Sequence, residues 1–310
     1  MNHLESAFKG SNRWYKYPVM FIATLIGGGF LGSIPLVIVK FCGKSVHEMN
    51  GDATSISDFS SYGIHPTMGL VLMMLPMLVG LWILTKLVKS FHNRTVKETI
   101  NGTERIRWSR FFYAAGLWAM FSGIVLLVDY LFFPGDYTVR LNWSALIPLV
   151  FVSLLIIPFQ TSFEELLFRG YLAQGVGVLF RNRFLTILIP AVLFALLHGI
   201  NPEVDAYGFW YAMSMYLTFG FLFGITSVLD DGIEVAMGAH AANNVFLSIF
   251  VSTRVSAIQT PALLLDNTTA PSMYELFGFI LISVVFVLIL GYKYKWRMNT
   301  LFLPIEVKAQ

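Results

Sequence analysis

The stretch from residue 146 to residue 175 reads LIPLVFVSLLIIPFQTSFEELLFRGYLAQG. It is longer than the roughly 20 apolar residues that an α-helix needs to cross a bilayer. The run nevertheless contains Glu164, Glu165 and Arg169, and ionisable side chains are costly to hold inside a membrane. Because such residues usually face a cavity or a partner, the stretch predicts a membrane-spanning helix that carries functional groups.

The composition of the whole chain agrees with a membrane protein. Of its 310 residues, 56% are hydrophobic and 13% are charged, whereas about a quarter of the residues in soluble domains are charged. The single cysteine, Cys42, excludes an intramolecular disulfide framework and a cysteine-rich metal site. A dispersed net charge of +3 does not indicate nucleic-acid binding. We therefore predict an all-α fold, a polytopic bundle of membrane helices.

Apolar runs of spanning length occur at about eight places along the chain. They lie at approximately 18–39, 67–88, 111–133, 146–175, 184–204, 209–229, 233–253 and 273–292. With the N-terminus placed in the cytoplasm, 16 of the 21 Lys and Arg residues lie in cytoplasmic segments, 4 lie outside and Arg169 lies within a span. This asymmetry follows the positive-inside rule, so we expect both termini to be cytoplasmic. We expect residues 1–310 to form a single domain in the cell membrane.

The charged residues of the fourth run are spaced so that they divide into a pair and a free acid. Glu165 and Arg169 are four residues apart and share one helical face, so they can form an ion pair. Glu164 points roughly 100° away from Glu165 and can face an interior cavity, where an apolar environment suits a carboxylate to act as a general base. The alternative is a buried ion pair that only fixes helix packing, which would leave Glu164 without a partner.

Two of the six histidines, His198 and His240, fall within predicted spans. Phe194 lies one turn before His198 and is expected to form a wall of the site. His240 and Asn244 are four residues apart on a face with small neighbours, and both could donate hydrogen bonds to a developing oxyanion. For each histidine the alternative is a hydrogen bond between helices of the bundle.

An acid, two histidines and an amide on three spans form a hydrolytic set only if they reach a common depth. Glu164 lies near mid-depth if its helix continues past Arg169, as the apolar run at 170–180 indicates. His198 lies 15 residues after Arg183, or about 22 Å along a helix. A tilted or late-starting fifth helix is therefore required.

Three motifs occur in order along the chain: Glu164-Glu165-x-x-x-Arg169, Phe194-x-x-x-His198 and His240-x-x-x-Asn244. Together they resemble the signature set of the CPBP family, which includes type II CAAX prenyl proteases and bacteriocin-processing or bacteriocin-immunity membrane proteins. The resemblance covers a core at about 145–250. Each motif alone has low specificity, and the specificity comes from their order.

The resemblance implies an eight-helix intramembrane endopeptidase whose site opens toward the cytoplasm. It implies that Glu164 activates a water molecule with assistance from His198. It also implies that His240 and Asn244 hold the oxyanion. Glu165, Arg169 and Phe194 would be supporting residues.

The family has been described both as metalloproteases and as enzymes with a metal-free mechanism of glutamate and histidine. The chain contains no HExxH motif, and we expect that it uses no cofactor. Glu164, His198 and His240 could nevertheless ligate zinc.

The composition resembles that of bacterial members, so we expect the substrate to be a peptide, such as a bacteriocin or pheromone precursor, or a membrane protein. Two other functions stay open at this point. One is a non-catalytic bacteriocin-immunity or scaffold protein that binds a peptide or a membrane partner. The other is a proton-coupled transporter that uses the same Glu and His residues for proton transfer, although no sequence repeat typical of such transporters is apparent.

Overall fold

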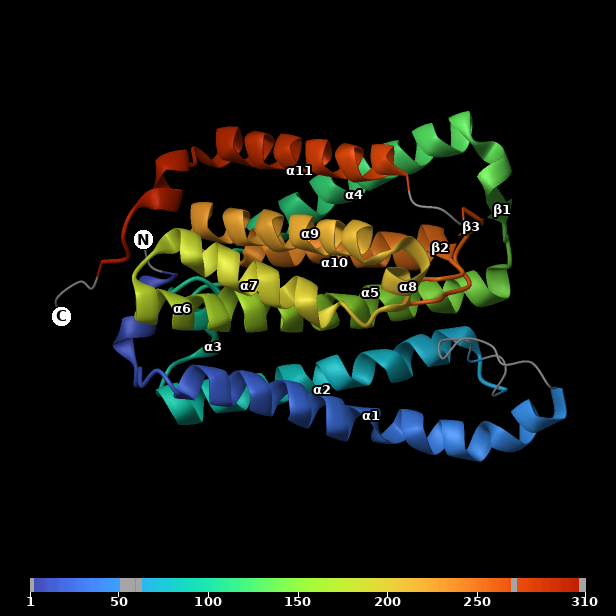
Figure 1. The fold of residues 1–310 in the computed structure, drawn as a ribbon, viewed down its shortest axis with the longest axis horizontal. Coiled ribbons are helices and arrows are strands. Elements are labelled where there is room, and N and C mark those ends of the chain that lie inside the picture. Colours follow the sequence, from blue (N-terminus) through green and yellow to red (C-terminus); the bar gives the residue numbers. More distant parts are fainter. Residues whose placement is uncertain (1–2, 51–58, 60–62, 269–271, 307–310) are drawn as a thin grey trace.

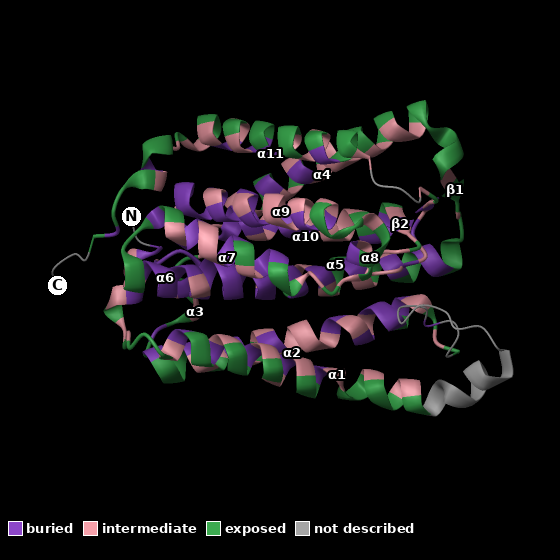
Figure 2. Ribbon diagram, in the orientation of Figure 1, coloured by how far each residue is buried: buried purple, intermediate pink, exposed green. Residues whose placement is uncertain are grey.

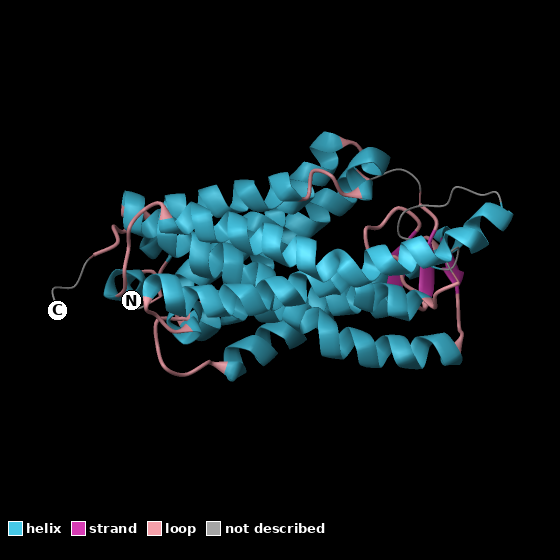
Figure 3. Ribbon diagram, turned by 90° about the horizontal axis from the view of Figure 1, so that it is seen from below, coloured by secondary structure: helices cyan, strands magenta, loops and turns pink. Residues whose placement is uncertain are grey.

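The computed structural model describes residues 3–50, 59, 63–268 and 272–306, with side chains for all of these except 42–50. Long helices run along one common axis and form an elongated bundle, as two perpendicular views show (Figures 1 and 3). Within the described residues, the strands are three in number and have three residues each. The predicted all-α polytopic bundle is confirmed.

The helices follow the apolar runs of the sequence. The longer ones are α1 (Lys16–Asn50), α2 (Pro66–His92), α4 (Trp108–Phe132), α5 (Trp143–Glu165), α7 (Arg183–Leu197), α9 (Phe209–Leu229), α10 (Glu234–Phe250) and α11 (Met273–Tyr294). The shorter ones are η1 (Glu5–Lys9), α3 (Val96–Ile100), η3 (Pro134–Asp136), η4 (Leu166–Leu172), α6 (Ala173–Phe180), α8 (Pro202–Tyr207) and η5 (Met298–Phe302).

The number of spans differs from the prediction of about eight. In the described part of the chain, six helical segments are long and apolar enough to cross a membrane. The fifth and seventh predicted runs form helices of only 15 and 17 residues, α7 and α10. α7 ends early because the chain turns at 198–201 before Pro202 begins α8, and α10 is bounded by a turn at 230–233 and by a strand. Hydropathy detects the apolar length of a run but not these boundaries.

The fourth predicted run forms one uninterrupted helix from Trp143 to Phe180, made of α5, η4 and α6. The prediction that this helix continues past Arg169 is confirmed. Its middle part, η4, is a π-helix of 7 residues. Such wider turns are rare and are found frequently at functional sites.

A small sheet lies at one end of the bundle (Figure 1). β1 (Tyr137–Val139) pairs antiparallel with β3 (Leu264–Asp266), and β2 (Val251–Thr253) pairs parallel with β3. Both η1 and η5 lie at the opposite end, where α6 and α7 meet. The sequence did not predict these strands, because three residues are too few to show a recognisable alternation.

The middle helices of the bundle are buried, whereas the outer faces of α1, α4 and α11 are exposed (Figure 2). These outer faces are apolar, with exposed side chains such as Phe30, Leu131 and Leu281, as is expected of a surface that contacts lipid. α1 packs tightly on α2, because a Cβ atom on Gly28 would lie only 2.8 Å from the Cα atom of Gly80.

Candidate active site

The two adjacent glutamates lie at the end of α5, where the π-helix begins, and both are buried. Glu165 Oε1 lies 3.0 Å from Arg169 Nη1, which is the ion pair that the four-residue spacing predicts. Glu164 is on a different face of the helix and contacts other partners. The division of the motif into a paired carboxylate and a second carboxylate is therefore present in the structure.

Arg169 is enclosed by carbonyl groups and aromatic rings. Its Nη2 atom donates weakly to the carbonyls of Phe219 and Gly220 in α9, at 3.5 and 3.4 Å. The guanidinium carbon lies 4.4 Å from the ring centre of Phe194 and 5.3 Å from that of Phe223. With 2% of its surface exposed, this arginine is a permanent buried positive charge beside Glu165.

His240 of α10 lies between the two carboxylates. Its Nδ1 atom is 2.7 Å from Glu165 Oε1, and its Nε2 atom is 3.6 Å from Glu164 Oε2. The ring stacks on Phe223 with a centroid distance of 5.0 Å. Because an ionised carboxylate only accepts hydrogen bonds, the contact with Glu165 places a proton on Nδ1 and directs Nε2 toward Glu164.

Gln160 is a residue of the site that the sequence analysis missed. It is buried and lies one helical turn before Glu164. Gln160 Nε2 donates to Glu164 Oε1 at 2.7 Å, and Gln160 Oε1 accepts from Asn244 Nδ2 at 3.4 Å. An amide at a four-residue spacing from an acid, inside an apolar run, was the signal that could have identified it.

Asn244 is on the same face of α10 as His240, as predicted, and its Nδ2 atom lies 3.4 Å from His240 Nε2. The amide of Asn244 therefore faces both Gln160 and the histidine. The structure thus brings together Glu164, His240 and Asn244 from two helices.

His198 has a different position from the other predicted residues. It follows the last residue of α7, and its Nδ1–H donates to the carbonyl of Phe194 at 2.7 Å. Its ring lies 4.3 Å from that of Phe194 and 4.6 Å from that of Tyr216. Within the described residues, no hydrogen bond or ion pair joins His198 to Glu164 or His240; Phe194 is the side chain that contacts both histidine rings.

A zinc ion would need three or four donor side chains around one point. No group of three or more His, Cys, Asp or Glu side chains in the described ranges is arranged to hold one. The hydrogen bonds at Nδ1 of His240 and of His198 leave Nε2 as the ring nitrogen of each histidine that could bind a metal ion. In the described arrangement, these two rings and Glu164 do not form such a group.

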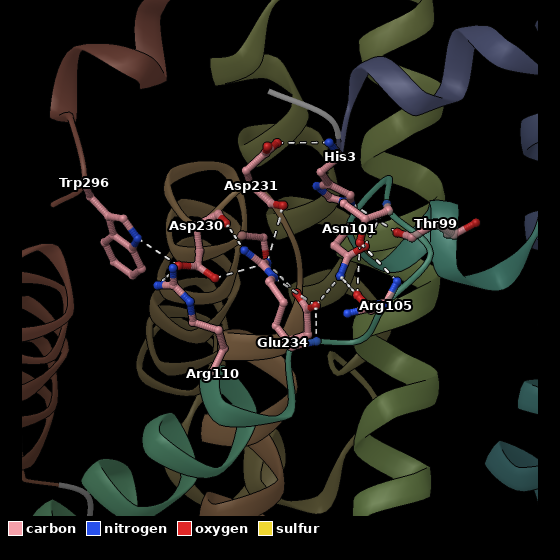
Figure 4. Close-up of polar contacts among 12 residues, drawn as sticks. His3, Thr99, Asn101, Arg105, Arg110, Asp230, Asp231, Glu234 and Trp296 are labelled. Atoms are coloured by element: carbon pink, nitrogen blue, oxygen red, sulfur yellow. Dashed lines mark hydrogen bonds and ion pairs between the residues drawn. The ribbon is translucent and has the colours of Figure 1, made fainter. Parts of the chain in front are cut away.

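A second polar group lies where α10 begins, and Figure 4 labels four of its members, Arg110, Asp230, Glu234 and Trp296. These four and Arg107, which forms ion pairs with Asp230 and Glu234, make up what we name the end cluster. Arg107 Nε and Nη2 donate to the two carboxylate oxygens of Glu234 at 3.0 and 2.5 Å. Arg110 Nη1 and Trp296 Nε1 both contact Asp230 Oδ1, at 2.7 and 2.9 Å. Because Glu234 is the first residue of α10, the end cluster anchors the helix that carries the histidine and amide of the site.

Burial is the largest influence on the pKa of Asp230. It raises the pKa of Asp230 to about 6, although Arg107 and Arg110 act in the opposite direction. The sequence does not predict the end cluster, because the contacts of Arg107 and Arg110 with Asp230 join segments about 120 positions apart.

The fold and this geometry define a class: a polytopic membrane protein whose bundle core holds an acid, a histidine and two amides. The sequence model of the family described as type II CAAX prenyl endopeptidase Rce1-like matches residues 143–246. This range contains every residue of the site. The chain belongs to this Rce1-like family, and so to a family of CAAX-type proteases that act on peptide or protein substrates.

A relative is similar to this chain over about two thirds of the length of each. The "Uncharacterized protein YyaK" of Bacillus subtilis (strain 168) is 34% identical over 208 residues, which are 67% of this chain and 68% of the relative. No solved structure matches the chain.

Proposed function

We propose that this chain is an intramembrane endopeptidase that hydrolyses a peptide bond of a peptide or membrane-associated substrate without a metal ion. Glu164 is the general base. His240 and Asn244 stabilise the oxyanion, and His198 assists at the edge of the site. Glu165, Arg169 and Phe194 support these groups.

The hydrolysis needs one proton to move twice. Glu164 takes a proton from a water molecule as the water oxygen attacks the carbonyl carbon of the scissile bond. The carbonyl oxygen then carries the negative charge of the tetrahedral intermediate. When the C–N bond breaks, the protonated Glu164 gives its proton to the leaving nitrogen, which restores the starting carboxylate.

The observation that carries this proposal is the meeting of Glu164 and His240 from separate helices, 3.6 Å apart. His240 can donate through Nε2 only when it is protonated on both nitrogens. In that form, the carboxylate of Glu165 lies at one N–H group and that of Glu164 near the other. A cationic donor beside an amide donor is suited to an oxyanion.

His198 is given an assisting role because its contacts leave one ring nitrogen unused. Nδ1–H is committed to the carbonyl of Phe194, so Nε2 is the acceptor of the neutral ring. This nitrogen is suited to hold the attacking water from the side of Tyr216. We expect His198→Ala to reduce the rate less than Glu164→Gln does.

The test compares the termini of membrane and secreted peptides from cells that make the wild type or Glu164→Gln. We expect at least one terminus to be lost in the variant, with a rate reduced by about 10²–10⁴. Asp129→Asn is the matched control, since Asp129 is an acid of α4 that bonds to the hydroxyl of Tyr137 instead of the site.

If the peptide termini are the same in all three samples, the protease proposal is wrong, and a non-catalytic immunity or scaffold protein or a transporter takes its place. Protection or binding that survives Glu164→Gln identifies the non-catalytic role, and substrate uptake that depends on a proton gradient identifies the transporter. A chelator added to the purified wild type is expected to leave cleavage unchanged, and loss of activity that zinc restores contradicts the metal-free mechanism.

A further inference from the structure

A chain of four hydrogen bonds, which we name the amide chain, leads from α4 through α10 to the acid in α5. Trp118 Nε1 donates to Asn243 Oδ1 at 3.2 Å, and Asn243 Nδ2 donates to Asn244 Oδ1 at 3.0 Å. Asn244 Nδ2 donates to Gln160 Oε1 at 3.4 Å, and Gln160 Nε2 donates to Glu164 Oε1 at 2.7 Å. The chain ends on the carboxylate to which we assign the base function.

The two ends of the amide chain fix its direction. The indole nitrogen of Trp118 can only donate, and an ionised Glu164 can only accept. Each of the three amides between them must therefore present its oxygen toward Trp118 and its NH₂ group toward Glu164. The orientation of an amide is usually assigned from its hydrogen-bond network, and here both ends of the network require the same assignment.

We propose that Trp118, Asn243 and Gln160 are positioning residues for the proposed hydrolysis. The amide chain holds the NH₂ group of Asn244 toward the site, where the oxyanion forms, and the donor from Gln160 fixes the orientation of the Glu164 carboxylate. This inference rests on the proposed function of Glu164 and Asn244. It assigns a role to residues outside the three motifs.

The simpler alternative is that these side chains only join helices, as polar groups often do in membrane bundles. Trp118 and Gln160 are 3% and 4% exposed, so their replacement affects packing in either case. The two explanations differ in which variant of Gln160 they predict to lose most activity. A packing role makes the isosteric Gln160→Glu mild, whereas the amide chain makes it severe because a second carboxylate then faces Glu164.

The first measurement uses a synthetic peptide that spans a cleavage site found in the comparison of wild type and Glu164→Gln. We expect kcat to fall with little change in KM, most for Gln160→Glu, by about fivefold or more for Gln160→Met, and about twofold for Trp118→Phe. The matched control is Gln174→Met, since Gln174 is also buried but donates to the carbonyl of His3. Its kcat per folded molecule should stay at the wild-type value.

The second measurement does not depend on protease activity. Dicyclohexylcarbodiimide reacts with protonated carboxyl groups in apolar surroundings, and peptide mass analysis locates the adduct at Glu164. The hydrogen bond from Gln160 occupies Glu164 Oε1 in the wild type. Its loss leaves this oxygen free to react, so we expect labelling of Gln160→Met to be about fivefold faster than that of wild type and Gln174→Met.

Equal labelling rates in wild type and Gln160→Met contradict the positioning role of the amide chain. A kcat for Gln160→Glu that stays above that of Gln160→Met contradicts it as well. Faster labelling of Gln160→Met, without any peptide that depends on Glu164, supports the amide chain as a feature of the structure and contradicts only the protease function.

Discussion

The two polar clusters of this molecule contain the same kinds of side chain but differ in how their charges are matched. In the end cluster, Arg107 and Arg110 directly face the carboxylates of Glu234 and Asp230. In the site, among the residues described, the two adjacent glutamates share one arginine and one histidine. The end cluster pairs each of these carboxylates with a guanidinium, whereas the site has one carboxylate more than it has guanidiniums.

This difference separates a cluster that stabilises from one that can react. In the end cluster, burial is outweighed by Arg107, which lowers the pKa of Glu234, whereas burial raises the pKa of Asp230 to about 6 despite Arg107 and Arg110. Glu164, by contrast, contacts a neutral amide and a histidine that is itself able to gain or lose a proton. A cluster with incomplete pairing in an apolar setting is where proton transfer is expected.

The largest effect on stability is expected from the arginine of the site. Arg169→Met leaves Glu165 as a buried charge with only His240 beside it, and we expect a loss of about 3–5 kcal/mol in the free energy of unfolding. The measurement is thermal or SDS-induced unfolding of the purified protein. A loss below about 1 kcal/mol would mean that water reaches this pair and that its burial is not maintained in solution.

A double variant sharpens this prediction. Combining Arg169→Met with Glu165→Gln removes both charges, so the double variant should be more stable than Arg169→Met alone. If the two losses simply add, the residues are not coupled as the 3.0 Å ion pair indicates.

A smaller effect is expected when the end cluster is broken in the same way. The side chain of Arg107 is 28% exposed, so water can partly replace it, and we expect Arg107→Met to cost about 1–2 kcal/mol. The turnover per folded molecule should stay at the wild-type value, which the peptide assay can measure. A loss of turnover without a loss of stability would assign the end cluster to the reaction.

The smallest effect is a dependence of stability on pH. The pKa of Asp230 is raised from 3.8 to about 6, so the folded protein binds this proton more tightly than the unfolded chain does. The contribution of this carboxyl group to stability is therefore largest below about pH 4 and decreases as the pH rises toward 6. The Tm of wild type minus that of Asp230→Asn should fall over this interval, and a constant difference contradicts the burial of Asp230.

The parts of the site that one helix carries could be predicted from the sequence. Four-residue spacing alone places Glu165 beside Arg169 and His240 beside Asn244, and the structure has both arrangements. The approach of Glu164 to His240 depends on how α5 packs on α10, and no local pattern encodes that contact. The catalytic roles of Glu164, His198, His240 and Asn244 stay predictions.

Other features were missed because neutral groups and short segments give weak signals. Gln160 carries no charge, so it was not noticed among the apolar residues of α5 although its spacing from Glu164 is the same as that of the ion pair. Two of the eight predicted spans form helices of fewer than 18 residues, α7 and α10, because hydropathy does not reveal the turns that end them. The membrane-bundle class, by contrast, follows directly from composition.

The length of the uninterrupted helix from Trp143 to Phe180 sets the depth of Glu164 in the membrane. It therefore sets the distance that water would travel to this carboxylate in the proposed reaction. At 1.5 Å per residue its 38 residues are about 57 Å long, nearly twice the hydrocarbon thickness of about 30 Å. Glu164 lies about 32 Å from Trp143 along this helix, or about 24 Å in depth even at a tilt of 40°. With the exposed Trp143 at the level of one interface, the carboxylate lies within a few ångströms of the other interface. This depth places Glu164 near an interface instead of the mid-depth expected from the sequence. In the proposed hydrolysis, water would therefore enter over a short distance, and the scissile bond would lie close to the membrane surface.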